Sequence, residues 1–252
     1  MTSIFKHGTK SLVFFLVLLL GGSSLQAKDL VIDLSAPIVQ ITTAFSGTEL
    51  LLFGAKRGAG DVIVVVRGPL ENQTVHLKER KLGIWVNTEH LTFDGLPSYY
   101  WVSSNRPLYD ILPADTLSRL QIGVDEIQIQ PTDTNTNSAA AIAFRAALIR
   151  DKIRKKLYLE DASPLLFLND MLFRTRISFP ANVSVGEFAI ETFLVRDQEI
   201  ITSETTLLNV RKFGLEAEIY DFAHKQSLLY GIFAVIIACA AGWLANAAFR
   251  RS

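Results

Sequence analysis

Five consecutive apolar residues stand between two charged ones in Asp61-Val-Ile-Val-Val-Val-Arg67. Apolar side chains on both faces are typical of a central strand that is covered from two sides. A second apolar run, Thr48–Gly54, precedes it, and the glycine-rich stretch 56–60 between the two has the composition of a turn. The two runs therefore predict a β-hairpin at the centre of a sheet.

Shorter strand candidates surround this hairpin, with glycine, proline and asparagine between them. Short strands with a turn signal about every 8–12 residues are typical of an immunoglobulin-like β-sandwich. We therefore expect a mainly β fold with helical insertions, and we assign 28–110 to an N-terminal β-sandwich region. The shorter candidates are Leu30–Leu34, Ile38–Thr42, Thr74–Lys78, Gly83–Asn87 and Tyr99–Ser103.

A helical region is predicted over 111–164. Pro113–Ile122 has the composition of a short helix, and Ala139–Tyr158 has the periodicity of an amphipathic helix. Ser163-Pro164 ends this region, because the residue before a proline disfavours helix. The stripe expected to face the core consists of Ile142, Ala146, Ile149, Ile153 and Leu157.

Strands return over 165–212, where the pattern predicts a three-stranded C-terminal meander. In the first of these strands Phe173, Ile177 and Phe179 alternate with polar residues, so one face is expected to be exposed. Two arrangements fit this pattern. The meander forms a second sandwich, or it completes the first one and makes the helices an insertion.

The N-terminal residues 1–27 have the layout of a secretory signal peptide. Lys6 and Lys10 precede an apolar core, Leu12–Leu20, and small residues lead to Ala27. The alternative is an uncleaved anchor, but the apolar core is much shorter than the ~20 residues that cross a bilayer. We therefore expect cleavage after Ala27.

The C-terminal residues 228–249 carry no charge and are long enough to span a membrane as one helix. A juxtamembrane helix is predicted before them, over 213–227. Arg250 and Arg251 lie in the tail 250–252, where positive charge favours the cytoplasmic side. Together with the signal peptide, this span predicts a domain outside the membrane and a short tail inside.

Small residues recur every four positions in this span, at Ala234, Ala238 and Gly242. That spacing allows another helix to approach closely, so these three residues are candidates for helix packing in the membrane. The alternative is a span that is simply rich in alanine.

Composition excludes several classes of protein. The formal net charge is +0, so no global charge draws the chain to nucleic acid. The single cysteine, Cys239, lies inside the C-terminal apolar block, so no disulfide forms within one chain.

No pattern in the chain indicates a catalytic, metal or cofactor site. His76, His90 and His224 are isolated, and neither a Gly-x-Ser-x-Gly sequence nor a phosphate-binding loop occurs. The adjacent acids Asp125-Glu126 and Glu160-Asp161 point to opposite faces if they lie on strands. We therefore expect no enzyme activity and no cofactor.

A basic run lies on the long predicted helix. It allows contact with anionic headgroups or an acidic partner, but the charges spread around the whole polar side, which favours a solvated helix back. The run consists of Arg145, Arg150, Lys152, Arg154, Lys155 and Lys156.

An aromatic cluster, Tyr99-Tyr100-Trp101, stands out in the middle of the chain. Alternation along a strand directs Tyr99 and Trp101 to one face and Tyr100 to the other. These side chains either pack in the core or form an aromatic patch that binds a ligand or partner, with Arg106 supplying a polar contact. Tyr99, Tyr100, Trp101 and Arg106 are therefore the candidate interaction residues.

Five segments of the chain have a recognisable sequence: Phe45–Gly54, Asp61–Pro69, Gly83–Asn87, Pro97–Val102 and the span that begins at Tyr230-Gly231. Through these segments the chain from Lys28 onward resembles a bacterial family of transmembrane proteins described from alphaproteobacteria. The resemblance implies an inner-membrane protein with a periplasmic domain and one C-terminal membrane helix, and it carries a loose association with transporters of the sulfite-exporter type. It supplies no catalytic residue.

These observations favour a non-enzymatic, membrane-anchored periplasmic accessory protein. Its expected partners are the lipid bilayer and an integral membrane protein, a transporter being one candidate, and nucleic acid is not among them. Two alternatives remain open. One is a small-anion-binding domain that uses Arg57, Arg67 or Arg106, and the other is an envelope enzyme whose site is assembled from distant strands.

Overall fold

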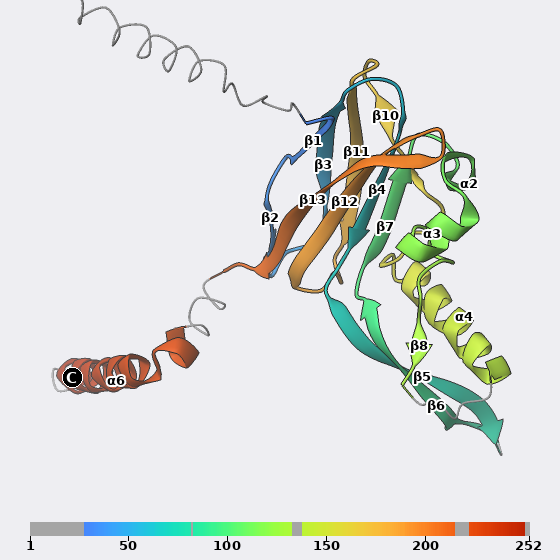
Figure 1. Cartoon of the computed structure of the whole chain (residues 1–252). Helices are drawn as coiled ribbons and strands as arrows, with labels where there is room; N and C mark the ends of the chain where they lie inside the picture. Colours follow the sequence, from blue (N-terminus) through green and yellow to red (C-terminus); the bar gives the residue numbers. More distant parts are fainter. Residues whose placement is uncertain (1–27, 82, 133–137, 215–221, 250–252) are drawn as a thin grey trace, which may run out of the picture.

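Two packed β-sheets form the body of the protein in the computed structural model, which describes residues 28–81, 83–132, 138–214 and 222–249 (Figure 1). The first sheet, called sheet A here, has four strands in the order β1-β3-β11-β10. Its strand pairs are all antiparallel. The strands are β1 (Leu30–Leu34), β3 (Gly47–Lys56), β11 (Leu172–Pro180) and β10 (Leu166–Phe167).

The second sheet, sheet B, has six strands in the order β2-β13-β12-β4-β7-β9. Strand β4 (Asp61–Arg67) lies between β12 and β7, and its five apolar residues are fully buried. The prediction of a central strand is confirmed. The predicted hairpin with Thr48–Gly54 is wrong, because that run lies in β3 of sheet A and pairs with β1 and β11 instead of β4. The remaining strands are β2 (Ile38–Ile41), β13 (Glu199–Lys212), β12 (Gly186–Arg196), β7 (Tyr100–Ser104) and β9 (Ser163–Pro164).

The C-terminal strands complete the same sandwich as the N-terminal ones. Strand β11 pairs with β3, and β12 pairs with β4. The structure therefore selects one sandwich with a helical insertion over two separate sandwiches. The mainly β fold class is confirmed, and the immunoglobulin-like topology stays a prediction.

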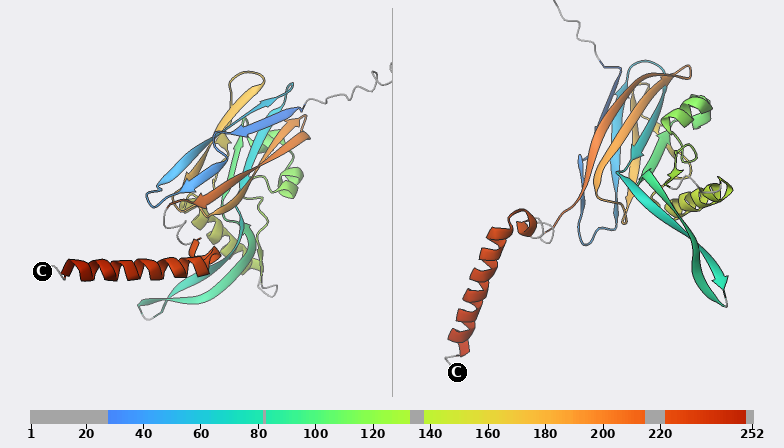
Figure 2. Two further views of the ribbon diagram at one scale, coloured as in Figure 1. Left: turned by 90° about the vertical axis from the view of Figure 1, so that its left-hand side faces the viewer. Right: turned by 60° about the horizontal axis from the view of Figure 1, so that its bottom comes forward.

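Helices α2 (Leu108–Ile111), α3 (Ala114–Leu120) and α4 (Ser138–Arg154) form a third layer on the outer face of sheet B (Figure 2). Consequently there are two cores. One lies between the sheets and contains Val62, Val64 and Val66, whereas the other lies between sheet B and the helices and contains Ile63 and Val65. Because successive side chains of β4 point to opposite faces of sheet B, this strand contributes to both cores.

The long helix differs from its prediction in length and in its buried face. Helix α4 ends at Arg154 rather than Tyr158, and Lys156 has a positive φ of 58° that interrupts a right-handed helix. Ile142 is 69% exposed, so the predicted stripe is wrong at this residue. The buried side chains of the helix are Phe144, Leu148, Ile149 and Lys152.

A long hairpin leaves the sandwich at one end. Strands β5 (Leu70–Lys81) and β6 (Ile84–Pro97) pair over their whole length, and β8 (Gln130–Pro131) joins them near the base. The strands predicted at 74–78 and 83–87 thus belong to a hairpin that projects from the body in Figures 1 and 2, not to the sandwich itself.

Helix α6 (Ser227–Phe249) follows the domain, and its side chains from Ser227 to Asn246 are exposed in the isolated chain. Its segment Ser227–Asn246 is long and apolar enough to cross a membrane. This agrees with the span predicted at 228–249. The predicted signal peptide 1–27, residues 215–221 of the predicted juxtamembrane helix and the tail 250–252 lie outside the described residues. Residues 222–225 of the predicted juxtamembrane helix are helical.

Candidate interaction site

The aromatic cluster lies in the two cores. Tyr99, Tyr100 and Trp101 are at most 4% exposed. Tyr99 and Trp101 face the core between the sheets and Tyr100 faces the helical layer, which confirms the predicted alternation. The core-packing alternative therefore describes these rings, and they form no exposed aromatic patch. An interaction role for them stays a prediction.

Tyr99 is held by both stacking and a hydrogen bond. Its ring stacks on Phe179 with centroids 5.1 Å apart, and its hydroxyl donates to the carbonyl oxygen of Ser178 at 2.8 Å. Burial raises the pKa of Tyr99 well above its ordinary value. These contacts fasten the start of β7 to β11 of the opposite sheet.

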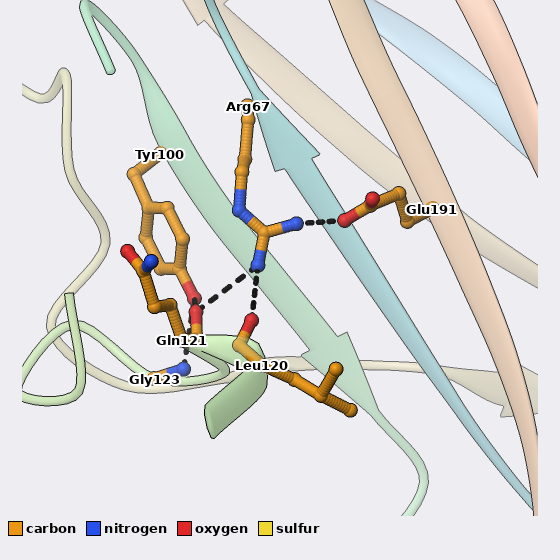
Figure 3. Close-up of polar contacts among 6 residues, drawn as sticks. All are labelled: Arg67, Tyr100, Leu120, Gln121, Gly123 and Glu191. Carbon is orange, nitrogen blue, oxygen red and sulfur yellow. Dashed lines mark hydrogen bonds and ion pairs between the residues drawn. The ribbon is translucent and has the colours of Figure 1, made fainter. Parts of the chain in front are cut away.

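Tyr100 lies in a polar network between sheet B and helix α3 (Figure 3). Its hydroxyl donates to the carbonyl oxygen of Gln121 at 2.7 Å and accepts from the backbone N–H of Gly123 at 2.8 Å. Burial raises the pKa of Tyr100 to about 12. The hydroxyl therefore stays protonated at neutral pH, and both of its hydrogen bonds are retained.

Arg67 completes this network from the end of β4. One guanidinium nitrogen bonds to Glu191 of β12, and another donates to the carbonyl oxygens of Leu120 at 2.7 Å and Gln121 at 3.1 Å. The guanidinium carbon also lies 5.8 Å from the centroid of the Tyr100 ring. Burial lowers the pKa of Arg67, but it remains a cation because the ordinary value is so high.

The network caps the C-terminal end of α3. The last carbonyl groups of a helix lack partners within the helix, and a cation near them is favourable. Gln121 takes the left-handed conformation, with φ of 53°, which turns the chain back toward Tyr100. The network of Arg67 and Tyr100 thus fixes the helical layer to sheet B, and Arg67 is a structural residue.

Arg106 lies at the opposite end of β4. Its guanidinium pairs with the carboxylate of Asp61, to which Asn105 also donates at 2.7 Å. The hydrogen bond to Arg106 is the largest of the effects that hold the pKa of Asp61 below its ordinary value. Half of the Arg106 side chain is exposed, so the ion pair lies at the surface.

The three arginines of the small-anion hypothesis do not converge on one place. Arg67 and Arg106 are bound at opposite ends of β4, about 20 Å apart at ~3.4 Å per residue. Arg57 lies in the exposed turn before β4. An anion at Arg67 would also have to displace Glu191. This geometry gives the hypothesis no support.

A groove of about 970 Å³ lies where α4 ends beside the turn between β11 and β12. The cluster residues Tyr99, Tyr100 and Trp101 line part of it. Its charged lining is balanced, with three cations and three carboxylates. These are Arg154, Lys155, Lys156, Glu49, Glu160 and Asp161.

Three residues of the basic run that ends in this groove pair with acidic side chains. Lys152 is 3% exposed, pairs with Glu71 and lies over the Tyr158 ring. Arg154 and Lys155 both pair with Asp151. A solvated helix back does not describe Lys152, because this residue joins α4 to the base of the hairpin. Headgroup contact by the others stays a prediction.

The outer face of sheet A carries a set of exposed apolar side chains that sequence analysis missed. Val31 pairs with Ala55, which pairs with Leu172, so these residues form one row across three strands. Phe53 lies in the next row and is 42% exposed. We call the following set the sheet A patch: Val31, Phe53, Leu166, Leu168, Met171 and Leu172.

In strand β11, which contributes to this patch, alternate residues face the core, as the sequence predicted for Phe173, Ile177 and Phe179. The patch lies on the other face, which was predicted only to be exposed. Its apolar members come from different strands, so only the strand order reveals that they are neighbours.

The three small residues proposed for helix packing lie on α6. Ala234, Ala238 and Gly242 are exposed along with the rest of that helix, and a side chain added at Gly242 would meet no atom within 4 Å. The helix therefore has room for a close neighbour at Gly242. Their packing role stays a prediction.

Two histidines that are far apart in the sequence are neighbours in the structure. His76 and His90 lie opposite one another on β5 and β6, with ring centroids 5.9 Å apart. Within the described ranges, no group of three or more histidine, cysteine, aspartate or glutamate side chains is arranged to hold a metal ion.

Taken together, the fold defines a class: a β-sandwich domain with a helical layer, followed by one apolar helix suited to a membrane. The chain belongs to the family described as "Putative transmembrane protein (Alph_Pro_TM)", whose model matches residues 29–251. No curated protein matches the chain. The match confirms the family resemblance and the membrane class of the protein.

Proposed function

We propose that the chain is a non-enzymatic interaction protein, anchored in the inner membrane, whose periplasmic domain holds a partner protein against the sheet A patch. The observation that carries this proposal is the patch itself. Four of its apolar side chains share the outer face of sheet A by strand register, and Leu168 and Met171 lie in the adjoining turn between β10 and β11; all six are more than a third exposed. A contiguous exposed apolar surface on a soluble domain favours a protein interface.

Polar residues border the patch in a way that suits an interface. Arg174 pairs with Phe53 in the strand register, and Asp33 lies on the other side of Phe53. An apolar centre with a charged rim is the usual composition of a protein contact surface. The rim would exclude wrong partners and fix the orientation of the right one.

The patch lies at the membrane-distal end of the sandwich in this proposal. Strand β13 leaves the domain toward α6, and β4 runs in the same direction because both are antiparallel to β12. Strand β3, which a short turn between the two sheets joins to β4, runs the opposite way and carries Phe53 near its end. The partner surface would therefore stand well above the bilayer.

Membrane anchorage would raise the effective concentration of such a partner if it lies in the same bilayer. The proposed orientation rests on the signal-peptide layout of residues 1–27 and on the positive charge of Arg250 and Arg251. The small residues Ala234, Ala238 and Gly242 would supply a second contact within the membrane. A transporter is the first class of integral membrane partner to test.

Site-specific photocrosslinking of the full chain in its own membranes tests this proposal. A photoreactive amino acid replaces Phe53 or Leu172 in the patch, and Ser203 on the exposed part of β13 serves as the matched control. We expect one crosslinked species of the same mass from both patch positions and none from Ser203.

Charge introduced into the patch provides the second arm of this test. Phe53→Asp should abolish the crosslink from position 172 and leave the melting temperature unchanged, because Phe53 is partly exposed on the sheet surface. Equal crosslinking from the patch and from Ser203 would contradict the proposal. Absence of any crosslink in the native membrane would contradict it as well.

A further inference from the structure

The hairpin β5–β6 projects from the same end of the sandwich as the chain that leads to the membrane helix. Strands β4 and β13 run in the same direction, because each is antiparallel to β12. Strand β5 follows β4 after only Gly68 and Pro69, and β13 continues toward α6. Both views in Figure 2 show the hairpin at the same end of the body as the C-terminal end of β13.

The hairpin is long enough to reach the bilayer. Strand β5 has 12 residues, which span about 40 Å at ~3.3 Å per residue. The connection from Phe213 to Gln226 spans at most about 50 Å when fully extended at ~3.5 Å per residue. Part of this connection is helical, which shortens it further. The membrane surface therefore lies within reach of the hairpin tip.

Among the described residues, the contacts that join the hairpin to other elements lie at its base. At the base, Phe93 pairs with Pro131 of β8, and Glu71 pairs with Lys152 of α4. Farther out, Leu77 and Ile84 are exposed, with Ile84 at 66%. A two-stranded ribbon is only marginally stable in water, so an exposed apolar tip of this kind is expected to rest on another surface.

The tip has the composition of a segment that lies at a membrane interface. Residues 78–81 read Lys-Glu-Arg-Lys, and residues 82–86 read Leu-Gly-Ile-Trp-Val. Basic residues are attracted to anionic headgroups, and tryptophan is enriched at the boundary between headgroups and acyl chains. Arg80 and Ile84 are both exposed. Arg80 thus offers a cation for the headgroups, and Ile84 offers an apolar group for the layer beneath them.

We propose that the tip of this hairpin, where the described side chains of Leu77, Arg80 and Ile84 are exposed, rests in the interfacial layer of the bilayer that α6 spans. The tip is a second membrane attachment, and with α6 it holds the sandwich in one orientation. This inference rests on the proposed anchorage by α6 but not on the partner at the sheet A patch. The bilayer is preferred to a protein partner because of the reach, the basic residues and the apolar turn together.

Fluorescence quenching in proteoliposomes tests the proposal with the full chain. The only cysteine in the sequence is Cys239, so a Cys239→Ala background allows one new thiol at a time. An environment-sensitive fluorophore is attached at Ile84→Cys, or at Arg57→Cys as the matched control. Arg57 is exposed in the turn between β3 and β4, at the opposite end of the sandwich.

The vesicles contain phosphatidylcholine and phosphatidylglycerol, with a quencher attached to the upper acyl chain. We expect a blue-shifted emission and several-fold stronger quenching at position 84 than at position 57. Vesicles of phosphatidylcholine alone, or the added change Arg80→Glu, should reduce quenching at position 84 and leave position 57 unchanged.

Equal quenching at the two positions would overturn the proposal. A fluorophore at position 84 that is shielded only in native membranes would overturn it too, because that result assigns the tip to a protein partner. Recovery of the chain with the vesicles after alkaline washing shows that α6 is anchored, so a negative quenching result then concerns the hairpin tip alone. Unchanged crosslinking at Phe53 separates that result from a failure of the proposed interaction.

Discussion

Replacement of Arg67 by methionine is expected to loosen the attachment of the helical layer to sheet B. The change keeps the length and apolar stem of the side chain but removes the cation. It removes the Arg67 donor from the carbonyl groups of Leu120 and Gln121, of which Gln121 keeps the Tyr100 hydroxyl, and it removes the partner of Glu191. The fold itself should persist, because both hydrophobic cores remain intact.

The magnitude follows from the burial of these groups. Leaving a buried polar group unpaired costs about 1–3 kcal/mol, and breaking a buried ion pair costs about 3–5 kcal/mol. The side chains of Arg67 and Glu191 are 22% and 34% exposed, so water compensates in part. We expect a loss of about 3 kcal/mol in the free energy of unfolding, or about 6–12 °C in melting temperature for a domain of this size.

Thermal and urea unfolding of the full chain in detergent micelles, followed by near-ultraviolet circular dichroism, measures this loss. Arg57→Met is the matched control because that arginine is exposed, and it should change stability by less than about 0.5 kcal/mol. A double mutant that adds Glu191→Gln should cost less than the sum of the single changes. If Arg67→Met is no more destabilising than Arg57→Met, the network does not hold the layers together.

Three further predictions concern other buried groups. Burial raises the pKa of Tyr100 to about 12, whereas a tyrosine in the unfolded chain titrates at about 10. The protonated hydroxyl therefore stabilises the fold fully below about pH 10, and up to about 3 kcal/mol of this stability is lost as the pH rises to about 12. Tyr100→Phe should flatten this part of the curve of unfolding free energy against pH, and an unchanged slope would contradict the burial of the Tyr100 hydroxyl. Gly54→Ala places a methyl group 2.5 Å from the Phe173 ring and should cost about 1–3 kcal/mol in urea unfolding, so a neutral result would refute the packing. Lys152→Ala should destabilise the domain more than Lys152→Met, because methionine still fills the space beside Tyr158, and equal melting temperatures would argue against this packing role.

The parts of the fold that depend on local pattern could be predicted from the sequence. Strand β4 was evident from five apolar residues, and β11 from its alternation. The single sandwich could not be predicted, because it depends on the pairing of β12 with β4. These strands are far apart in the sequence, and no local pattern specifies that they pair. The hairpin was misplaced for the same reason: its strands look like sandwich strands in sequence, whereas their pairing partners decide where they lie.

The candidate site shows the same division. Alternation correctly separated Tyr99 and Trp101 from Tyr100, but it could not decide whether the rings were buried or exposed. The Arg67 contact with Glu191 joins residues 124 positions apart, so no spacing rule indicates it. The sequence pattern predicts a solvated charge at Lys152, because nothing local indicates its acidic partner in the distant hairpin.

The orientation of the domain across the membrane is tested most directly by thiol labelling in intact spheroplasts. Single cysteines at position 57 in the sandwich and at position 252 in the tail are compared in the Cys239→Ala background, using a maleimide that does not cross membranes. We predict labelling at position 57 in intact spheroplasts and labelling at position 252 only after the membrane is permeabilised. Labelling of position 252 from outside, or release of the intact chain by an alkaline wash, would contradict the account.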